Sequence, residues 1–160
     1  MARTGEVVTA SSFDYLCFHS PYHKLVQKGY TRLAYMDYLK SPTGEAFAGV
    51  SEEMSPASMT YEKSLESREL DAAFRPIAAA GFSSAVGPTS YLSKNIGNCY
   101  TGAVFFNLLS LVNDVAEAEL LGKRVGMFSY GSGSVATLYS IRPREPTSGA
   151  FTLGRIAEVK

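Results

Sequence analysis

The chain has 160 residues, of which 46% are hydrophobic, and its 15 basic side chains balance 15 acidic ones. This length and composition are typical of one globular domain with a hydrophobic core, and they exclude a disordered chain. The balanced charge, without a basic tract, argues against nucleic acid or an anionic membrane surface as a partner. No run of about 20 apolar residues is present, so the sequence predicts no membrane-spanning helix.

Cysteine content and the N-terminal residues indicate the compartment. The two cysteines, Cys17 and Cys99, are too few for a disulfide framework, and no Cys/His cluster at metal-ligand spacing predicts a metal site. Residues 1–12 are polar and lack the apolar segment of a secretory signal. We therefore expect a cytoplasmic protein without a bound metal, in which residues 1–12 are poorly ordered.

The first predicted element is a short buried strand over residues 13–18, FDYLCF, which ends at His19. Ser20 and Pro21 follow, and these residue types favour the cap and the first position of a helix. Apolar residues then recur at helical spacing, so we predict a helix from this point to about Lys40.

The middle of the chain is less regular. Residues 41–60 are rich in Ser, Pro, Gly, Met and Glu, and we expect them to form an irregular surface excursion. Apolar spacing predicts a helix over residues 61–80, with a break or kink at Pro76. Residues 81–88, GFSSAVGP, are predicted to form a loop, and residues 89–93, TSYLS, a strand.

The last third begins with a turn at residues 94–102, KNIGNCYTG, and a helix that we expect to be deeply buried because apolar residues fill much of its circumference. These residues are Val104, Phe105, Leu108, Leu109, Leu111, Val112 and Val115. Residues 124–130 and 134–141 are predicted strands that pair back on each other. The order of strands and helices places residues 13–142 in an α/β layered fold, followed by an irregular tail over residues 143–160.

His19 and two lysines are the first candidates for chemistry. A histidine at a strand end beside a helix start could polarise a carbonyl or move a proton near neutral pH. A structural hydrogen bond is the commoner role of such a residue. Lys24 and Lys28 share one helix face, where they repel each other and do not favour the helix start. A phosphate-bearing ligand would account for both lysines, and an ordinary solvated face is the alternative.

Two further segments could contact a substrate. In GNCYTG, Asn98 is suited either to cap a helix or to donate an amide hydrogen bond to a substrate oxygen. Cys99 beside it is either a thiol activated by the helix start or a small buried hydrophobic residue. In FSYGSG, the glycines around Ser132 suit backbone contact with an oxyanion and equally suit a hairpin turn. This segment is not the GxSxG nucleophile elbow, because no helical stripe follows it.

Together, and in this order, three segments resemble 3-hydroxy-3-methylglutaryl-CoA synthases, specifically their C-terminal half. FHSPYHKLVQK resembles the family's FHSPY-x-KLVQK signature. GNCYTGAVFFNLLSLV resembles its GN-x-YT-x-S-x-Y-x-x-LxSLL helix, and GKRVGMFSYGSGSVATLYSIR resembles its GKR-[IV]-G-x-FSYGSG-x-x-ATLYS segment. The similarity runs from about Phe13 to Arg142 and implies a thiolase-like α/β layered fold, of which this chain holds only the C-terminal half.

The resemblance implies an activity and a set of site residues. The family condenses acetyl-CoA with acetoacetyl-CoA and water to give HMG-CoA and CoA, in the mevalonate pathway of isoprenoid biosynthesis, and uses no cofactor besides these thioesters. His19 matches the histidine that contacts the acetoacetyl group and helps activate the thioester carbonyl. Lys24 and Lys28 match lysines that contact CoA. Asn98 and Ser132 match residues that hydrogen-bond the acyl part of the ligand.

The resemblance also implies what this chain lacks. The family's cysteine nucleophile and glutamate acid/base belong to its N-terminal half, which has no counterpart here, so we expect the chain alone to be inactive. The full enzyme is expected to be a homodimer, and the isolated chain to self-associate through its uncovered face. Cys99 and His23 fill variable positions of the signatures and receive no role, and Ala103 replaces a common serine.

Two alternatives remain open. The chain could be a non-catalytic thiolase-like half-domain that binds a partner or dimerises through its apolar helix. Alternatively, Cys99 could be a nucleophile with His19 as its base, because the two halves of thiolase-like folds resemble each other. The same resemblance between halves would also explain why Cys99 is placed like a nucleophile even if it has no catalytic role.

Overall fold

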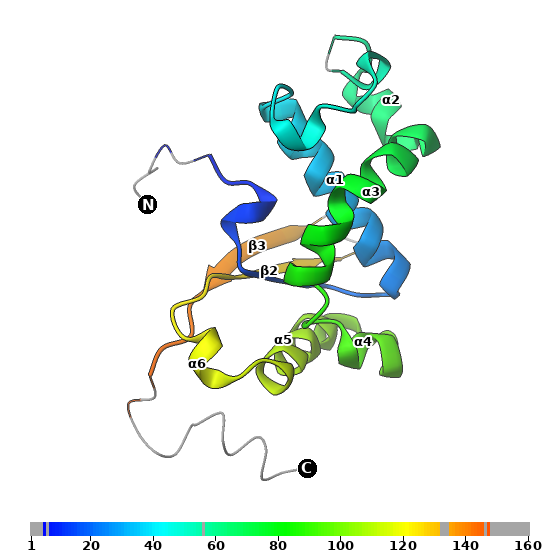
Figure 1. The fold of residues 1–160 in the computed structure, drawn as a ribbon. Coiled ribbons are helices and arrows are strands. Elements are labelled where there is room, and N and C mark those ends of the chain that lie inside the picture. The colour runs from blue at the N-terminus through cyan, green and yellow to red at the C-terminus, as the bar shows by residue number, and fades with distance from the viewer. Residues whose placement is uncertain (1–4, 6, 56, 132–134, 146, 148–160) are drawn as a thin grey trace.

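The computed structural model describes residues 5, 7–55, 57–131, 135–145 and 147. The 3-10 helices are η1 Ala10–Ser12, η2 Glu45–Phe47, η3 Glu52–Met54 and η4 Tyr100–Gly102. The α-helices are α1 His23–Lys40, α2 Tyr61–Glu66, α3 Arg68–Ala85, α4 Tyr91–Ile96, α5 Ala103–Asp114 and α6 Glu117–Leu120. The strands are β1 Tyr15–Phe18, β2 Val125–Tyr130 and β3 Ala136–Ile141, and they lie between two groups of helices (Figure 1).

The sheet has the order β1-β2-β3. β1 and β2 are parallel, with Cys17 opposite Met127, and β2 and β3 form an antiparallel hairpin, with Phe128 opposite Leu138. All three of these strands were predicted from the sequence and are confirmed. Because β1 and β2 are parallel, the chain must cross over between them, and helices α1 to α6 form that crossover.

Alternate residues of β1 enter two different cores, as the period of a strand requires. Leu16 and Phe18 pack with Val26 and Tyr30 of α1 and with the end of α3. Cys17 points to the other side and packs with residues of α5, α6 and β2. The sheet is therefore the middle layer, with α1 and α3 on one side and α4 and α5 on the other (Figure 1).

A third, largely aromatic cluster holds the outer ends of α1 and α3 together. Tyr35 and Tyr38 of α1 surround the fully buried Phe74 of α3, with ring centroids 5.2 and 5.4 Å from it. Phe47 from residues 41–60 packs on the same ring, and other apolar residues of that excursion pack against the cluster. The predicted irregular excursion is thus a short cover on this cluster, built around η2 and η3.

The prediction of one helix over residues 61–80 with a break at Pro76 is wrong in two respects. The helix is interrupted at a different residue, and it ends later than predicted. The break falls at Ser67, whose hydroxyl accepts a hydrogen bond from the backbone N–H of Leu70 and caps α3. Pro76 lies inside α3, on an exposed position where water can satisfy the carbonyl that its missing N–H leaves free. The helix then continues through Gly81, where a Cβ atom would lie 2.5 Å from the hydroxyl of Tyr30, so this glycine serves close packing.

The predicted loop over residues 81–88 is therefore helical as far as Ala85, and the predicted strand over residues 89–93 is also wrong. Residues from Tyr91 onward form α4. Hydroxyl groups explain the change, since Thr89 donates to the carbonyls of Leu16 and Val86 and so fixes the turn between α3 and α4.

The apolar helix α5 is not deeply buried all round, contrary to the sequence prediction. Its inner face buries two polar side chains, Asn107 and Ser110, whereas Phe105 is 61% exposed and Phe106 and Leu109 are also exposed. Strand β3 is exposed along most of its length as well. Although α5 is apolar, no helix among the described residues is long and apolar enough to cross a membrane.

Candidate functional site

His19 directly follows β1, at the end of the sheet where the carboxyl ends of the parallel strands β1 and β2 meet. The helix after it begins later than predicted, at His23, with Tyr22 in the cap position. Ser20 is not a cap: its side chain is buried, and its hydroxyl has no hydrogen-bond partner among the described residues. An extended segment therefore separates His19 from α1 and places the imidazole at the strand end.

The surroundings of His19 hold it firmly while leaving part of its ring free. Its backbone N–H donates to the carbonyl of Phe128 on β2, at 2.7 Å. Its ring meets the ring of Tyr130 edge-on, with centroids 5.0 Å apart. The Nδ1 atom is buried and has no hydrogen-bond partner in the described part of the chain. The Nδ1 atom of His23 is buried and unpaired in the same way, so the position at the strand end, and not the unpaired atom, distinguishes His19.

Asn107 belongs to this site and was missed by the sequence reasoning. It lies on the inner face of α5, is 2% exposed, and donates from Nδ2 to the carbonyl of Phe18, at 2.7 Å. Its Oδ1 atom is buried without a partner among the described residues. The only signal in the sequence was a single asparagine inside the apolar run VFFNLLSLV.

His23 is the second histidine near the strand end, and its environment favours the neutral form. Burial, with a smaller contribution from the charge of Lys94, lowers the pKa of His23 below its ordinary value. The ring packs on Phe82 of α3, with centroids 5.7 Å apart. These contacts make His23 a packing residue at the start of α1.

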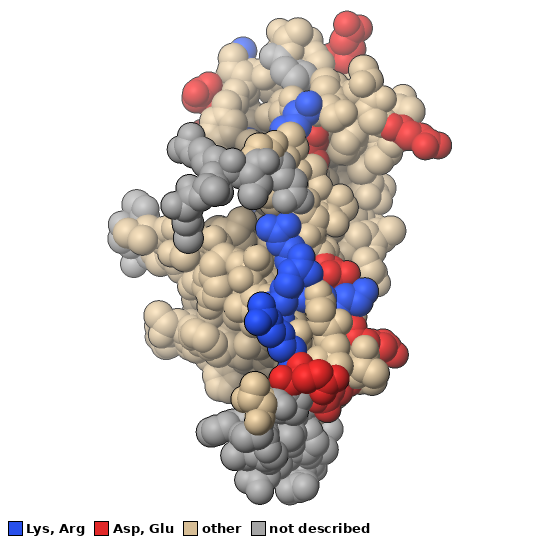
Figure 2. Space-filling view, turned by 90° about the vertical axis from the view of Figure 1, so that its left-hand side faces the viewer, with Lys and Arg blue, Asp and Glu red and all other residues tan. Residues whose placement is uncertain are grey.

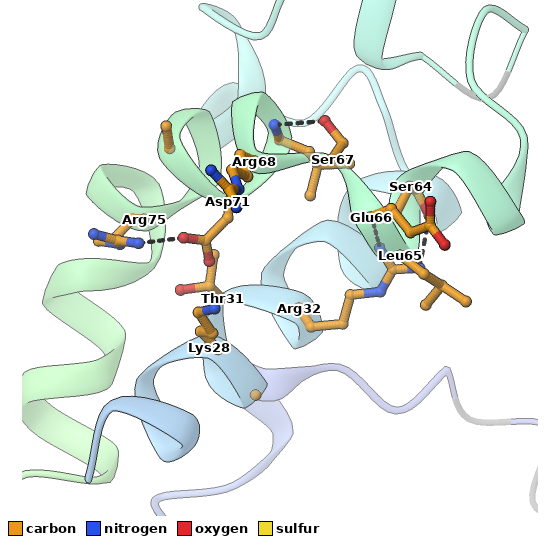
Figure 3. A pocket seen from close by; sticks show the side chains of 13 residues that line it. Lys28, Thr31, Arg32, Ser64, Leu65, Glu66, Ser67, Arg68, Asp71 and Arg75 are labelled. Carbon is orange, nitrogen blue, oxygen red and sulfur yellow. Dashed lines mark hydrogen bonds and ion pairs between the residues drawn. The ribbon is translucent and has the colours of Figure 1, made fainter.

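Lys24 and Lys28 lie exposed on α1, and neither forms an ion pair within the described chain. Lys28 lines an open groove of about 750 Å³ between α1 and the α2–α3 segment (Figure 3). Three arginines line the groove with it: Arg32, Arg68 and Arg75. Arg32 donates to the backbone and the hydroxyl of Ser64, and Arg75 pairs with Asp71 (Figure 3), so both are engaged within the protein. Lys24 does not line this groove.

Asn98 does not cap α5, contrary to one sequence interpretation, because η4 intervenes and α5 begins at Ala103. Instead its Oδ1 atom accepts a hydrogen bond from the backbone N–H of Tyr100, at 2.8 Å. Tyr100 has a φ of 49°, a left-handed conformation that is uncommon for an aromatic residue. The Asn98 amide N–H₂ has no partner in the described residues, which leaves it free to donate to a ligand.

Cys99 is half-buried beside Asn98, and its thiol points back to the carbonyl of Gly97, at 3.7 Å. It precedes η4 and does not lie in the first turn of α5, so the helix start proposed to activate it is not adjacent. Among the described residues, no hydrogen bond joins Cys99 or Asn98 to His19. Cys17, the other thiol, lies in β1, and burial raises its pKa to about 12.

Ser132 lies outside the described residues. Of the described residues near it, Gly131 donates from its backbone N–H to the carbonyl of Val135 at 3.0 Å. Gly131 follows β2 directly and lies at the same end of the sheet as His19.

A basic surface lies at the opposite end of the sheet, where β2 begins and β3 ends. Figure 2 shows Lys and Arg side chains gathered in a column on that side of the molecule. Lys123, Arg124 and Arg142 meet Asp14 there. The hydrogen bond from the backbone of Arg124 to the Asp14 carboxylate is the main cause that lowers the pKa of Asp14, and Lys123 and Arg142 add to it. These cations lie away from His19.

Sequence comparison identifies relatives of the whole region. The profile of the family described as hydroxymethylglutaryl-coenzyme A synthase, C terminal, matches residues 2–159. A hydroxymethylglutaryl-CoA synthase of Zymoseptoria tritici is 41% identical over 135 residues, which cover 84% of this chain and 29% of that protein. One of Gibberella zeae is 44% identical over 130 residues, which cover 81% of this chain and 28% of that protein.

Solved structures show the same fold. MvaS in complex with 3-hydroxy-3-methylglutaryl coenzyme A matches with a TM-score of 0.64 and 24% identity, over 90% of this chain and 29% of that one. The HMG synthase of the curacin biosynthetic pathway, in complex with a holo donor-ACP, matches with a TM-score of 0.55 and 24% identity, over 84% of this chain and 25% of that one. These matches confirm the thiolase-like fold predicted from the sequence.

The extent of the matches defines which part of the family this chain represents. It spans less than a third of the length of the relatives above. The matching profile is that of the C-terminal region. The chain therefore belongs to the hydroxymethylglutaryl-CoA synthase family and corresponds to part of its C-terminal region.

Proposed function

We propose that this chain supplies the acyl-CoA-binding part of a hydroxymethylglutaryl-CoA synthase, an enzyme that condenses acetyl-CoA with acetoacetyl-CoA and water to HMG-CoA and CoA. The setting of His19 carries the proposal. The residue lies at the joint carboxyl end of two parallel strands, and its Nδ1 atom is buried without a partner in the described chain. A half-buried imidazole held at this end of the sheet suits contact with a substrate carbonyl.

Each matched residue has a role that its position supports. His19 hydrogen-bonds the acetoacetyl group and polarises its carbonyl. Asn98 donates its free amide N–H₂ to the acyl part, and Ser132, which lies outside the described residues, adds a further hydrogen bond. Lys24 and Lys28 bind the phosphates of CoA, and their exposed, unpaired charges on one face of α1 suit that ligand.

The remaining catalytic groups come from elsewhere in this proposal. In the family, a cysteine nucleophile and a glutamate acid/base belong to the N-terminal half, so this chain binds acyl-CoA and becomes active only with that half. The joined enzyme works as a homodimer. The short coverage of the relatives' length is consistent with this division of the site.

Joining this chain to the N-terminal part of a related synthase tests the proposal. Release of CoA from acetyl-CoA and acetoacetyl-CoA is followed for the joined protein and for His19→Ala. We expect the substitution to reduce the rate by about 100-fold or more, the contribution typical of a positioned acid–base group. His23→Asn is the matched control, because the second histidine has no assigned role, and it should retain activity. Equal rates for His19→Ala and the unchanged protein would remove His19 from the mechanism.

A second candidate function rests on the outer face of α5. Phe105, Phe106 and Leu109 are exposed on that helix, and the neighbouring Tyr91 and Ile96 of α4 are exposed too. Apolar side chains gathered in this way are typical of a surface covered by another chain. A non-catalytic module that assembles through this face is therefore the alternative, and it predicts association without acyl-CoA binding.

A further inference from the structure

We propose that Asn107 is a positioning residue for His19. It acts through the peptide unit between Phe18 and His19, which Asn107 and β2 hold from opposite sides. The inference rests on the proposed function only for the catalytic meaning of His19, and the geometry that supports it stands by itself.

β1 is an edge strand of the described sheet. In the described sheet β1 pairs with β2 alone, so the carbonyls of Leu16 and Phe18, which point away from β2, have no strand to bind. Side chains take the place of the strand. Thr89 donates to Leu16 at 2.9 Å, and Asn107 donates to Phe18 at 2.7 Å. Both bonds are buried, so each carbonyl has a partner that water does not replace.

Asn107 binds the peptide unit that precedes the Cα atom of His19. The carbonyl of Phe18 and the N–H of His19 belong to one planar peptide group. Asn107 holds its oxygen at 2.7 Å, and the carbonyl of Phe128 holds its N–H at 2.7 Å. Because a planar group fixed at both ends cannot rotate, the direction in which His19 leaves the backbone is fixed as well. Thr89 binds the carbonyl of Leu16, two residues before Phe18, and does not contact the peptide group of His19.

An asparagine is otherwise a poor choice at this position. It has a lower helix propensity than leucine, and it is buried in a helix whose neighbouring residues are apolar. Its Oδ1 atom has no partner in the described chain, so half of the amide is unsatisfied. Leucine would fill the same space without an unsatisfied polar atom. The contact with Phe18 is the interaction that accounts for the amide.

The test compares two substitutions of similar shape in the chain as it is. Asn107→Leu removes the contact at Phe18, and Thr89→Val removes the matched contact at Leu16. Proton NMR then follows the imidazole signals through a pH titration. The chain has two histidines, so His23 is an internal reference in every spectrum. We expect Asn107→Leu to shift or broaden the signals of His19 and to leave those of His23 in place, and Thr89→Val to leave both in place.

The outcome is decisive for either substitution. The proposal is overturned by His19 signals that are unchanged in Asn107→Leu, or by signals that Thr89→Val moves as far or further. If leucine disturbs the fold, Asn107→Ser replaces it, because the shorter side chain cannot reach Phe18 and adds no bulk. The spectra report the orientation of His19 without turnover, so a failed activity assay would count against the proposed function and would leave this inference intact.

Discussion

On one side of the sheet, α1 and α3 bury Tyr35, Tyr38 and Phe74 in a cluster that the excursion at residues 41–60 covers. On the other side, α5 buries Asn107 and Ser110 against β1 and α4, and turns phenylalanine and leucine outward. The α1–α3 layer is therefore complete in the sense that the described chain covers its aromatic cluster. The α4–α5 layer buries Val104 and Leu111 together with these polar side chains, and it leaves an apolar surface outside.

The difference indicates which part of the molecule a larger assembly would cover. A helix that turns apolar side chains outward gains nothing from them in water, so the outer face of α5 is suited to a partner surface. The matched relatives are more than three times as long as the matched region. The site residue His19 lies between the two layers, at the end of the sheet.

The largest expected effect comes from the complete layer. Phe74→Ala should lower the free energy of unfolding by about 3–5 kcal/mol, because the fully buried ring leaves a cavity among aromatic neighbours. Phe105→Ala, the same change on the exposed face of α5, should alter it by about 0.5 kcal/mol or less. Urea unfolding measures both. Similar losses for the two variants would mean that the α4–α5 face is packed in solution and that the comparison fails.

A smaller effect is expected on association. The double substitution Phe105→Lys and Leu109→Lys should reduce self-association of the chain, measured by sedimentation velocity, because charge on an apolar contact surface opposes its burial. Unfolding should be nearly unchanged. Ala79→Lys adds charge to an exposed position of α3, on the other side of the sheet, and it should leave association as it was. A monomeric unmodified chain, with a cooperative melt, would contradict an uncovered apolar face.

The smallest effect is a pH dependence in the complete layer. Because the pKa of His23 is lowered in the folded state, the unfolded state binds a proton more readily. The stability that the neutral His23 side chain contributes is therefore present above about pH 6.5, and it is lost as the pH falls below that value. Lys94→Ala should move the NMR titration midpoint of His23 upward by only part of the shift, because burial is the larger cause. A midpoint at or above the ordinary value in the unmodified chain would be inconsistent with this environment.

Local patterns in the sequence predicted the strands and α1 well, because strand-length apolar runs and a long helical stripe each require one kind of structure. The region from Gly81 to Ser93 was predicted wrongly for tertiary reasons. Gly81 was taken as a helix end and instead makes room for Tyr30, and the hydroxyl of Thr89 binds a strand carbonyl far away in the chain. Neither contact has a signature within the segment itself.

The candidate site, like the fold, could be predicted only where a local pattern marks the residue. The placement of His19 followed from a strand followed by a helix start, which is a local pattern. Asn107 could not be found by such a pattern, since its partner Phe18 is 89 residues earlier. The helix that carries it was judged buried all round because apolar residues filled its circumference, whereas Asn107 is buried and Phe105 of the same helix is exposed. Sequence periodicity shows that a helix has an apolar face and does not show which chain covers it.

The most direct test of the central claim is calorimetric titration of this chain with acetoacetyl-CoA, compared with the double substitution Lys24→Ala and Lys28→Ala. We predict binding that weakens by about fivefold or more, since the loss of exposed charge contacts of about 1 kcal/mol corresponds to that ratio. Lys63→Ala, on an exposed position of α2 outside the lining of the groove, should bind as the unmodified chain does. Identical affinity in the double variant, or no binding by the unmodified chain at millimolar ligand, would contradict the claim that this chain carries the acyl-CoA-binding surface.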